Sequence, residues 1–300
     1  MRNFHGARKT RSYFEGWYFK QQNETDVVAL IPSFHVDRTG RRSASLQAIT
    51  NDQSFSVPFP AEAFRASEGR FCVRLGRSVF TRGGCQLDCE TEELKLKGQL
   101  QYGPFTPPDT DVMGPFRFVP GMQCRHSVFS LSHRVDGWIS VNGKKMVFQR
   151  GTGYMEGDRG RSFPRRYVWT QGSADGGCVM LSIADIPAGG RSFTGCIACI
   201  LWEGKEYRLA TYTGVELLHI GKRLLMVKQG DLLLTVQLLK DCPLPLQAPQ
   251  GGAMGRTIHE SGACLVRYRL LRGSRVVFDF TSGKAGFESE WEDAYEPSAT

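Results

Sequence analysis

Four side chains that can donate, accept or orient protons lie close together near the middle of the chain. The segment Gly151–Pro164 contains Tyr154, Glu156, Asp158 and Arg159. A carboxylic acid held in a partly buried place has a raised pKa and can act as a proton donor. We therefore take Asp158 and Glu156 as candidate catalytic acids and Tyr154 as a candidate proton relay. The alternative interpretation is a salt-bridged connection in which both acids pair with neighbouring arginines.

The glycines of this segment are compatible at first sight with a phosphate-binding loop. Such a loop ends in Gly-Lys-Ser or Gly-Lys-Thr and leads into a helix, and neither feature is present here. We expect instead a long loop that places the two acids just before the aromatic strand Arg166–Gln171.

The elements that must position these residues are short strands. The 300 residues include 34 Gly, 19 Phe, 9 Tyr and 5 Trp, a combination that favours strands and turns over long helices. Two hairpin turns are visible, Val141-Asn-Gly-Lys144 and Trp202-Glu-Gly-Lys205. Only Pro60–Ala66 has the pattern of a short helix. The sequence therefore predicts an all-β sandwich or barrel and excludes a helical bundle, a coiled coil and a disordered chain.

A weak internal repeat divides the chain. Arg11–Gln21 and Arg161–Gln171 align without gaps, and an apolar strand follows each of them. This repeat predicts an internal duplication into two antiparallel β-barrel or sandwich halves, each with room for one apolar ligand. We expect an N-terminal half at residues 1–130, a C-terminal half at residues 131–290 and a tail at residues 291–300.

Charge and cysteine content suggest a protein of the cytoplasm. The formal net charge is +8, but no nucleic-acid-binding motif accompanies it, so we expect no specific nucleic-acid partner and consider weak contact with an anionic membrane surface. The start of the chain is basic without a following apolar stretch, which predicts no secretory leader. The 9 cysteines are expected to be free thiols, and we expect no metal and no cofactor.

Several motifs in the same order resemble the tocopherol cyclase family. The first is Phe14-Glu-Gly-Trp-Tyr-Phe-Lys20, which is also similar, more distantly, to carotenoid hydratase-type proteins. A central block and two closing motifs follow over most of the chain: Trp138–Gln149, Gly153-Tyr-Met-Glu156, Phe163-Pro-Arg165, Trp169-Thr-Gln171, Leu246-Gln-Ala-Pro249 and Phe278–Ser282. The chain departs from the family pattern at Gly157-Asp158-Arg159, where plant-type cyclases have Lys-Asn-Trp.

The resemblance implies two lipocalin-like β-barrels and an isomerase activity, the acid-promoted ring closure of a prenylated quinol. In this reaction an acid protonates an alkene of the prenyl tail, and the phenol oxygen attacks the resulting cation. Aromatic faces stabilise such a cation. Glu15, from the first motif, becomes a third candidate acid. Candidate substrate-binding residues are Trp17, Tyr18, His35, Phe163 and Trp169.

Each of these assignments has a structural alternative. Core packing is the more common role for tryptophans such as Trp17 and Trp169, and His35 is equally compatible with a hydrogen-bonded position at a strand end. His126 is interpreted as a brace at the junction of the halves. The departure at Gly157-Asp158-Arg159 also leaves open a different class of function, a non-catalytic lipocalin-like carrier of a hydrophobic prenyl-lipid ligand. The enzyme is expected to be cytoplasmic, with membrane-peripheral attachment as the alternative location.

Overall fold

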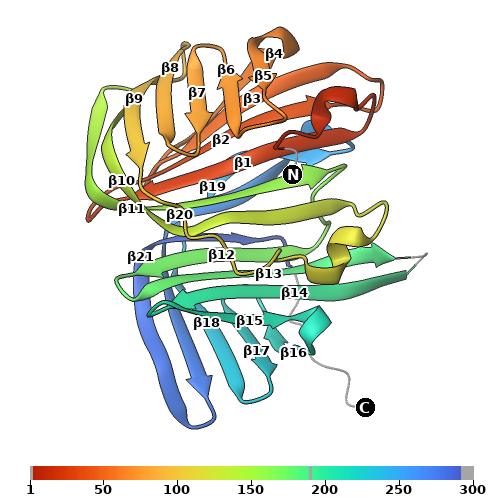
Figure 1. Cartoon of the computed structure of the whole chain (residues 1–300), viewed down its shortest axis with the longest axis vertical. Helices are drawn as coiled ribbons and strands as arrows, with labels where there is room; N and C mark the ends of the chain where they lie inside the picture. The colour runs from red at the N-terminus through yellow and green to blue at the C-terminus, as the bar shows by residue number, and fades with distance from the viewer. Residues whose placement is uncertain (1–2, 189–190, 292–300) are drawn as a thin grey trace. The chain divides into compact units, whose positions relative to one another are not determined.

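The computed structural model describes residues 3–188 and 191–291, and these are almost entirely antiparallel strands (Figure 1). Eleven strands form the first sheet in the order β4-β3-β2-β1-β11-β10-β9-β8-β7-β6-β5. Their bounds are β1 (Tyr13–Gln22), β2 (Val27–Val36), β3 (Arg42–Ile49), β4 (Ser54–Pro60), β5 (Phe64–Ala66), β6 (Cys72–Leu75), β7 (Ser78–Thr81), β8 (Gly84–Glu90), β9 (Lys95–Tyr102), β10 (Cys124–Val141) and β11 (Lys144–Gly160).

The second sheet has the order β15-β14-β13-β12-β21-β20-β18-β17-β16, and β19 also pairs with β20. Its strands are β12 (Tyr167–Ala174), β13 (Gly177–Ala188), β14 (Arg191–Trp202), β15 (Lys205–Ala210), β16 (Glu216–Ile220), β17 (Leu224–Gln229), β18 (Leu232–Lys240), β19 (Leu244–Gln250), β20 (Ala253–Arg272) and β21 (Arg275–Ser289).

The helical content of the described residues is limited to four short 3-10 helices: η1 (Gly6–Arg8), η2 (Ala61–Ala63), η3 (Gly114–Phe118) and η4 (Thr211–Thr213). The helix expected at Pro60–Ala66 is therefore wrong, because η2 is one turn and leads directly into β5. Within the described ranges, no helix has the length and apolar character that crossing a membrane requires.

The all-β fold class with two barrel-like halves is confirmed, and the two sheets share one strand order. Reading from β4 in the first sheet and from β15 in the second, nine strands correspond one to one, with β1 matching β12 and β11 matching β21. Such agreement along the whole order is what an internal duplication predicts.

The gapless alignment of Arg11–Gln21 with Arg161–Gln171 nevertheless does not match residues on the same face of the two sheets. Relative to the structure, it is off by an odd number of positions. Trp17 and Phe19 point into the core of the first unit. In β12 it is Val168 that points into the core of the second unit, so Trp169, the aligned equivalent of Phe19, lies on the opposite face of its sheet. Since side chains alternate along a strand, a slip of one residue exchanges the two faces.

Two compact units divide the chain. The first comprises residues 1–107, 123–163 and 245–257, and the second comprises residues 108–122, 164–244 and 258–300. The boundary expected after residue 130 thus falls inside β10. Of the tail expected at residues 291–300, only Trp291 is described, and it is 1% exposed in the core of the second unit.

The first sheet has two different faces. One face carries the aromatic and aliphatic core of the first unit, in which Trp17 contacts Phe64 and Phe71. The opposite face carries polar side chains, and we call it the polar face. Its residues alternate with core residues along β1, β2, β3, β10 and β11: Tyr18, Lys20, Ser33, His35, Ser45, Gln47, His126, Tyr154, Glu156 and Asp158.

The segment 151–160, expected as a loop, is the second half of strand β11. Its glycines occur where neighbouring groups approach closely. A Cβ atom at Gly153 would lie 2.2 Å from His133 Nε2, and one at Gly160 would lie 2.1 Å from the carbonyl oxygen of Gln123. Glycine inside a strand often marks such a contact. The loop prediction was wrong because these glycines are needed for close packing within a strand and do not form turns.

Candidate functional site

Strand pairing in the first unit brings four proton-exchanging side chains together on the polar face. Tyr154, Glu156 and Asp158 alternate along β11 and therefore point to the same side. His126 of β10 is the direct partner of Asp158 across the ladder. We call Tyr154, Glu156, His126 and Asp158 the acid cluster.

The members of the acid cluster form a continuous chain of polar contacts. The Tyr154 hydroxyl donates a hydrogen bond to Glu156 Oε2. His126 lies between the two acids, with Nε2 3.4 Å from Glu156 Oε2 and Nδ1 3.1 Å from Asp158 Oδ1. One imidazole thus contacts both carboxyl groups, and its Nδ1 is hydrogen-bonded to Asp158.

Burial changes along this chain. Tyr154 and Glu156 are 2% and 5% exposed, whereas the Asp158 side chain is 23% exposed. Gly16, the β1 partner of Asp158, is half-buried and adds no side chain to the row that runs from His126 through Asp158 to Ser33. The cluster is therefore closed at Glu156 and reaches solvent at Asp158.

Two neutral groups border the cluster. The Cys124 thiol lies 3.5 Å from Asp158 Oδ1 and donates to it. Burial, together with the Asp158 charge, raises the pKa of this thiol well above its usual value, so it remains protonated. Burial also lowers the pKa of His35 to about 4, and its Nε2 contacts Ser33 Oγ at 3.0 Å. His35 is therefore neutral at pH 7.

Of the three candidate acids, the structure brings Glu156 and Asp158 together and leaves Glu15 apart. Glu15 alternates with the polar-face residues of β1 and so points to the other side of the sheet. Its carboxylate accepts hydrogen bonds from the Tyr13 hydroxyl and from the His5 backbone amide, both at 2.8 Å.

The candidate substrate-binding residues also separate into groups. Tyr18 is the β1 partner of Glu156 on the polar face. Phe163 forms an edge-to-face pair with Phe14, whose ladder partner is His35. Trp17 is a core residue of the first unit, and Trp169 belongs to the second unit, where it is 7% exposed.

Two polar-face residues were not selected from the sequence. His126 had been interpreted as a brace, and only the pairing of β10 with β11 places it between the acids. Lys20 is 1% exposed and is the β1 partner of Tyr154. The alternation of Lys20 with Tyr18 in the first motif was the available signal for it.

The acid cluster also has the composition of a divalent cation site. His126, Glu156 and Asp158 each offer a ligand atom, and these atoms lie within 4.8 Å of one another. Two carboxylates and an imidazole are common ligands of transition metals. In the structure the same side chains contact one another, with His126 3.4 Å from Glu156 and 3.1 Å from Asp158.

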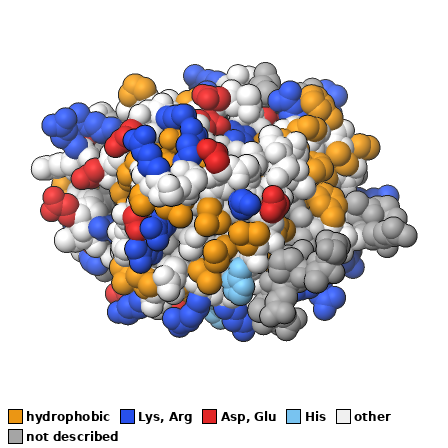
Figure 2. Space-filling view, turned by 90° about the horizontal axis from the view of Figure 1, so that it is seen from below, with side chains coloured by type: hydrophobic (Ala, Val, Ile, Leu, Met, Phe, Trp, Pro, Cys, Tyr) orange, Lys and Arg blue, Asp and Glu red, His pale blue; other side chains and the backbone are white. Residues whose placement is uncertain are grey.

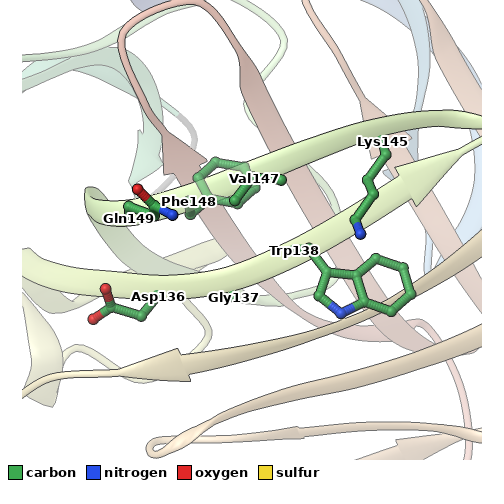
Figure 3. Close-up of a pocket in the computed structure, with 7 residues that line it drawn as sticks. All are labelled: Asp136, Gly137, Trp138, Lys145, Val147, Phe148 and Gln149. Atoms are coloured by element: carbon green, nitrogen blue, oxygen red, sulfur yellow. The ribbon is translucent and has the colours of Figure 1, made fainter.

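A separate surface hollow of about 290 Å³ lies along the β10–β11 hairpin (Figure 3). The residues that line it, 136–138, 145 and 147–149, do not include the acid cluster. Trp138 and Lys145 line it, with Lys145 Nζ 5.1 Å from the centre of the Trp138 ring. Its acid, Asp136, is bound by Arg134 at 2.5 Å, and this contact lowers the pKa of Asp136. A carboxylate held ionised by an arginine is a poor proton donor, so we exclude this hollow as the place of acid chemistry.

The chain has a lipocalin-like, all-β fold built from two related sheets, and comparison with solved structures agrees. A protein from Nitrosomonas europaea assigned to AttH superposes with a TM-score of 0.58 at 14% identity over 93% of each chain. CghA, solved with Sch210972, gives a TM-score of 0.60 at 12% identity, covering 93% of this chain and 89% of CghA.

Kievitone hydratase from Nectria haematococca gives a TM-score of 0.54 at 12% identity, with coverage of 93% of this chain and 89% of the hydratase. At these identities the likeness is one of fold. No family model matches the sequence, and no curated protein matches it.

Proposed function

We propose that the chain is a tocopherol cyclase-like enzyme that protonates an alkene of a prenylated quinol or isoprenoid lipid, leading to ring closure or hydration. The observation that carries the proposal is the buried acid cluster, in which Glu156 contacts Tyr154 and His126. In the reaction the Glu156 O–H bond breaks and a C–H bond forms at the alkene. The phenol oxygen, or a water molecule, then forms a C–O bond to the tertiary cation and releases its own proton.

Three members of the acid cluster, Glu156, His126 and Asp158, have one role each in this proposal. Glu156 is the proton donor, because it is the more deeply buried of the two acids. His126 accepts the proton of Glu156 at Nε2 or returns it, while its Nδ1–H donates to the Asp158 carboxylate. Asp158, which reaches solvent, takes up the replacement proton. The arrangement needs no redox cofactor, because the substrate neither gains nor loses electrons.

The polar face supplies aromatic groups that suit a carbocation. Tyr18 lies opposite Glu156 in the ladder, and the Phe14–Phe163 pair, with ring centres 5.5 Å apart, lies further along the same face. A cation over an aromatic face is stabilised by about 0.5–2 kcal/mol. Tyr18, as the ladder partner of Glu156, is the aromatic side chain placed to stabilise a cation formed beside the proton donor.

Sequence motifs and fold support the same class. The motifs around Phe14–Lys20 and Gly153–Glu156 resemble those of tocopherol cyclases, and both contribute residues to the polar face. Among the proteins of similar fold, kievitone hydratase has a name that states a hydration.

The test is product formation in heavy water. The protein is incubated with geranylated and phytylated hydroquinones in D₂O, and products are analysed by mass spectrometry. We expect a chromanol, or a hydrated lipid, that carries one carbon-bound deuterium, because the acid cluster exchanges with solvent through Asp158. Glu156→Gln should abolish the product. Glu260→Gln, which removes an equally buried carboxyl group of the second unit, is the matched control and should retain activity.

A lipid carrier is the second candidate, favoured by the departure at Gly157-Asp158-Arg159. Native mass spectrometry separates the two functions. A co-purified prenyl lipid that stays chemically unchanged after long incubation, together with no product from any hydroquinone, would reject the enzyme and support the carrier.

A further inference from the structure

Two basic segments that are distant in sequence lie side by side in the first unit. Residues 7–11 run from η1 toward β1, and residues 37–42 run from the end of β2 to the first residue of β3. The Ser12 amide donates to the Asp37 carbonyl at 2.9 Å, and Arg42 Nη2 donates to the Ala7 and Lys9 carbonyls at 3.2 and 2.9 Å. These bonds bring six cations to one edge of the unit, which we call the basic edge: Arg8, Lys9, Arg11, Arg38, Arg41 and Arg42.

The positive charge of the basic edge is almost uncompensated. All six side chains are exposed, and none forms an ion pair within residues 3–188 and 191–291. The two segments contain one acid, Asp37, and its Oδ1 accepts hydrogen bonds from the amides of Thr39 and Arg41. The Thr39 hydroxyl donates to the same oxygen at 2.7 Å, and this bond, followed by those of the amides, lowers the pKa of Asp37. The acid is thus bound inside the turn.

Several basic residues elsewhere in the described part of the chain pair with an acid. Arg77, Arg134 and Arg267 each pair with an aspartate at 2.5–2.7 Å. On the face shown in Figure 2, Lys and Arg side chains lie among acidic and apolar ones. The basic edge has six cations and one acid, against a formal net charge of +8 for the whole chain.

The edge offers charge without stacking surfaces or apolar anchors. The nearest aromatic rings, Tyr13 and Phe34, are 6% and 5% exposed and lie beneath Lys9 and Arg42. Proteins that bind single-stranded nucleic acid need exposed aromatic rings on which bases stack. A surface of guanidinium groups without such rings fits a plane of phosphate groups, which arginine binds through paired hydrogen bonds.

We propose that the basic edge docks on an anionic lipid bilayer. Binding is electrostatic and superficial, because the only apolar side chain in the two segments is Ala7. Each basic residue close to an anionic leaflet strengthens binding by about fivefold. This inference does not depend on the proposed enzyme activity, since it uses none of the residues of the acid cluster.

Vesicle sedimentation tests the proposal. The full chain is mixed with phosphatidylcholine vesicles that contain about 30 mol% phosphatidylserine, or none, at an ionic strength of about 0.1 M, where charges interact over about 10 Å. We expect binding to the anionic vesicles alone, and release on raising the salt to about 1 M. The variant Arg8→Gln/Arg11→Gln/Arg41→Gln should bind about 100-fold more weakly, because it lacks three of the six charges.

The control variant removes the same charge from the second unit. Lys222→Gln/Arg223→Gln/Arg275→Gln replaces three exposed cations and should bind like the unchanged protein. Equal weakening in both variants, or no binding to anionic vesicles, overturns the proposal. Duplex DNA is the third arm. If the protein binds DNA but not vesicles, and the basic-edge variant loses DNA binding, the basic edge is a nucleic-acid-binding surface and the membrane proposal is wrong.

Discussion

Two buried histidines make the first unit sensitive to mild acid. Burial lowers the pKa of His35 and of His133 to about 4, against 6.5 for an exposed imidazole. Because the unfolded chain binds these two protons at a higher pH than the folded protein does, unfolding is favoured as the pH falls from about 6.5 to about 4. Above pH 6.5 both histidines are largely neutral in the folded and the unfolded state, so they no longer lower the free energy of unfolding.

The size of the effect follows from the two pKa values. Between pH 7 and pH 5, each histidine lowers the free energy of unfolding by about 2 kcal/mol, since protonation of the unfolded state is nearly complete at pH 5 and that of the folded state is not. Over the full range each contributes about 3 kcal/mol. Both together cost about 4 kcal/mol at pH 5, a large part of the stability of an ordinary domain.

Denaturant unfolding followed by circular dichroism at pH 7, 6 and 5 measures this difference. His35→Gln and His133→Gln each remove one titrating group, so each variant should lose about 2 kcal/mol less than the unchanged protein between pH 7 and pH 5. His259→Gln is the control, because His259 is exposed. If both buried variants keep the full pH dependence, the burial argument is refuted.

Three further changes probe the core, the strand and the acid cluster. Trp17→Ala should lower the free energy of unfolding by about 3–5 kcal/mol, measured by chemical denaturation, because Trp17 is packed in the first core rather than exposed to ligand. Gly153→Ala should cost about 1–3 kcal/mol, since the added Cβ would lie 2.2 Å from His133 Nε2, whereas Gly69→Ala meets no atom within 4 Å and should be neutral. Excess EDTA should leave product formation in the hydroquinone assay unchanged, and a loss of activity that added Zn²⁺ or Mn²⁺ restores would assign the acid cluster to a metal instead.

Local turn signals allowed much of the fold to be predicted from the sequence. Asn142 and Gly143 adopt φ values of 48° and 89°, and Glu203 and Gly204 adopt 49° and 75°, as tight hairpins require. Both hairpins form where expected, β10 with β11 and β14 with β15. The positions of the strands depend on such short-range preferences, which the sequence carries directly.

The acid cluster could be predicted only in part, because β-bulges set its final register. Tyr154, Glu156 and Asp158 share a face through simple alternation. Counting outward from the Asn142–Gly143 turn, however, pairs His126 with Arg159 and turns it to the core side. Register shifts along β10 and β11 move the pairing by one residue and place His126 opposite Asp158. Bulges depend on tertiary packing, so no local pattern revealed this contact.

The order in which the chain contributes to its two units has a consequence for synthesis on the ribosome. The segment 245–257 belongs to the first unit, where the Gln247 amide and carbonyl bond to the Gln47 side chain at 2.8 and 2.9 Å and Ser54 Oγ donates to the Pro245 carbonyl at 2.7 Å. Residues 164–244, which form most of the second unit, must be translated before this segment emerges. At roughly 5–20 residues per second, the segment 245–257 is synthesised on the order of ten seconds or more after β3 and β4, so their hydrogen bonds to it form only after that delay. The unit that begins first is thus completed only after most of the other has been made, and no single cut in the chain separates the two.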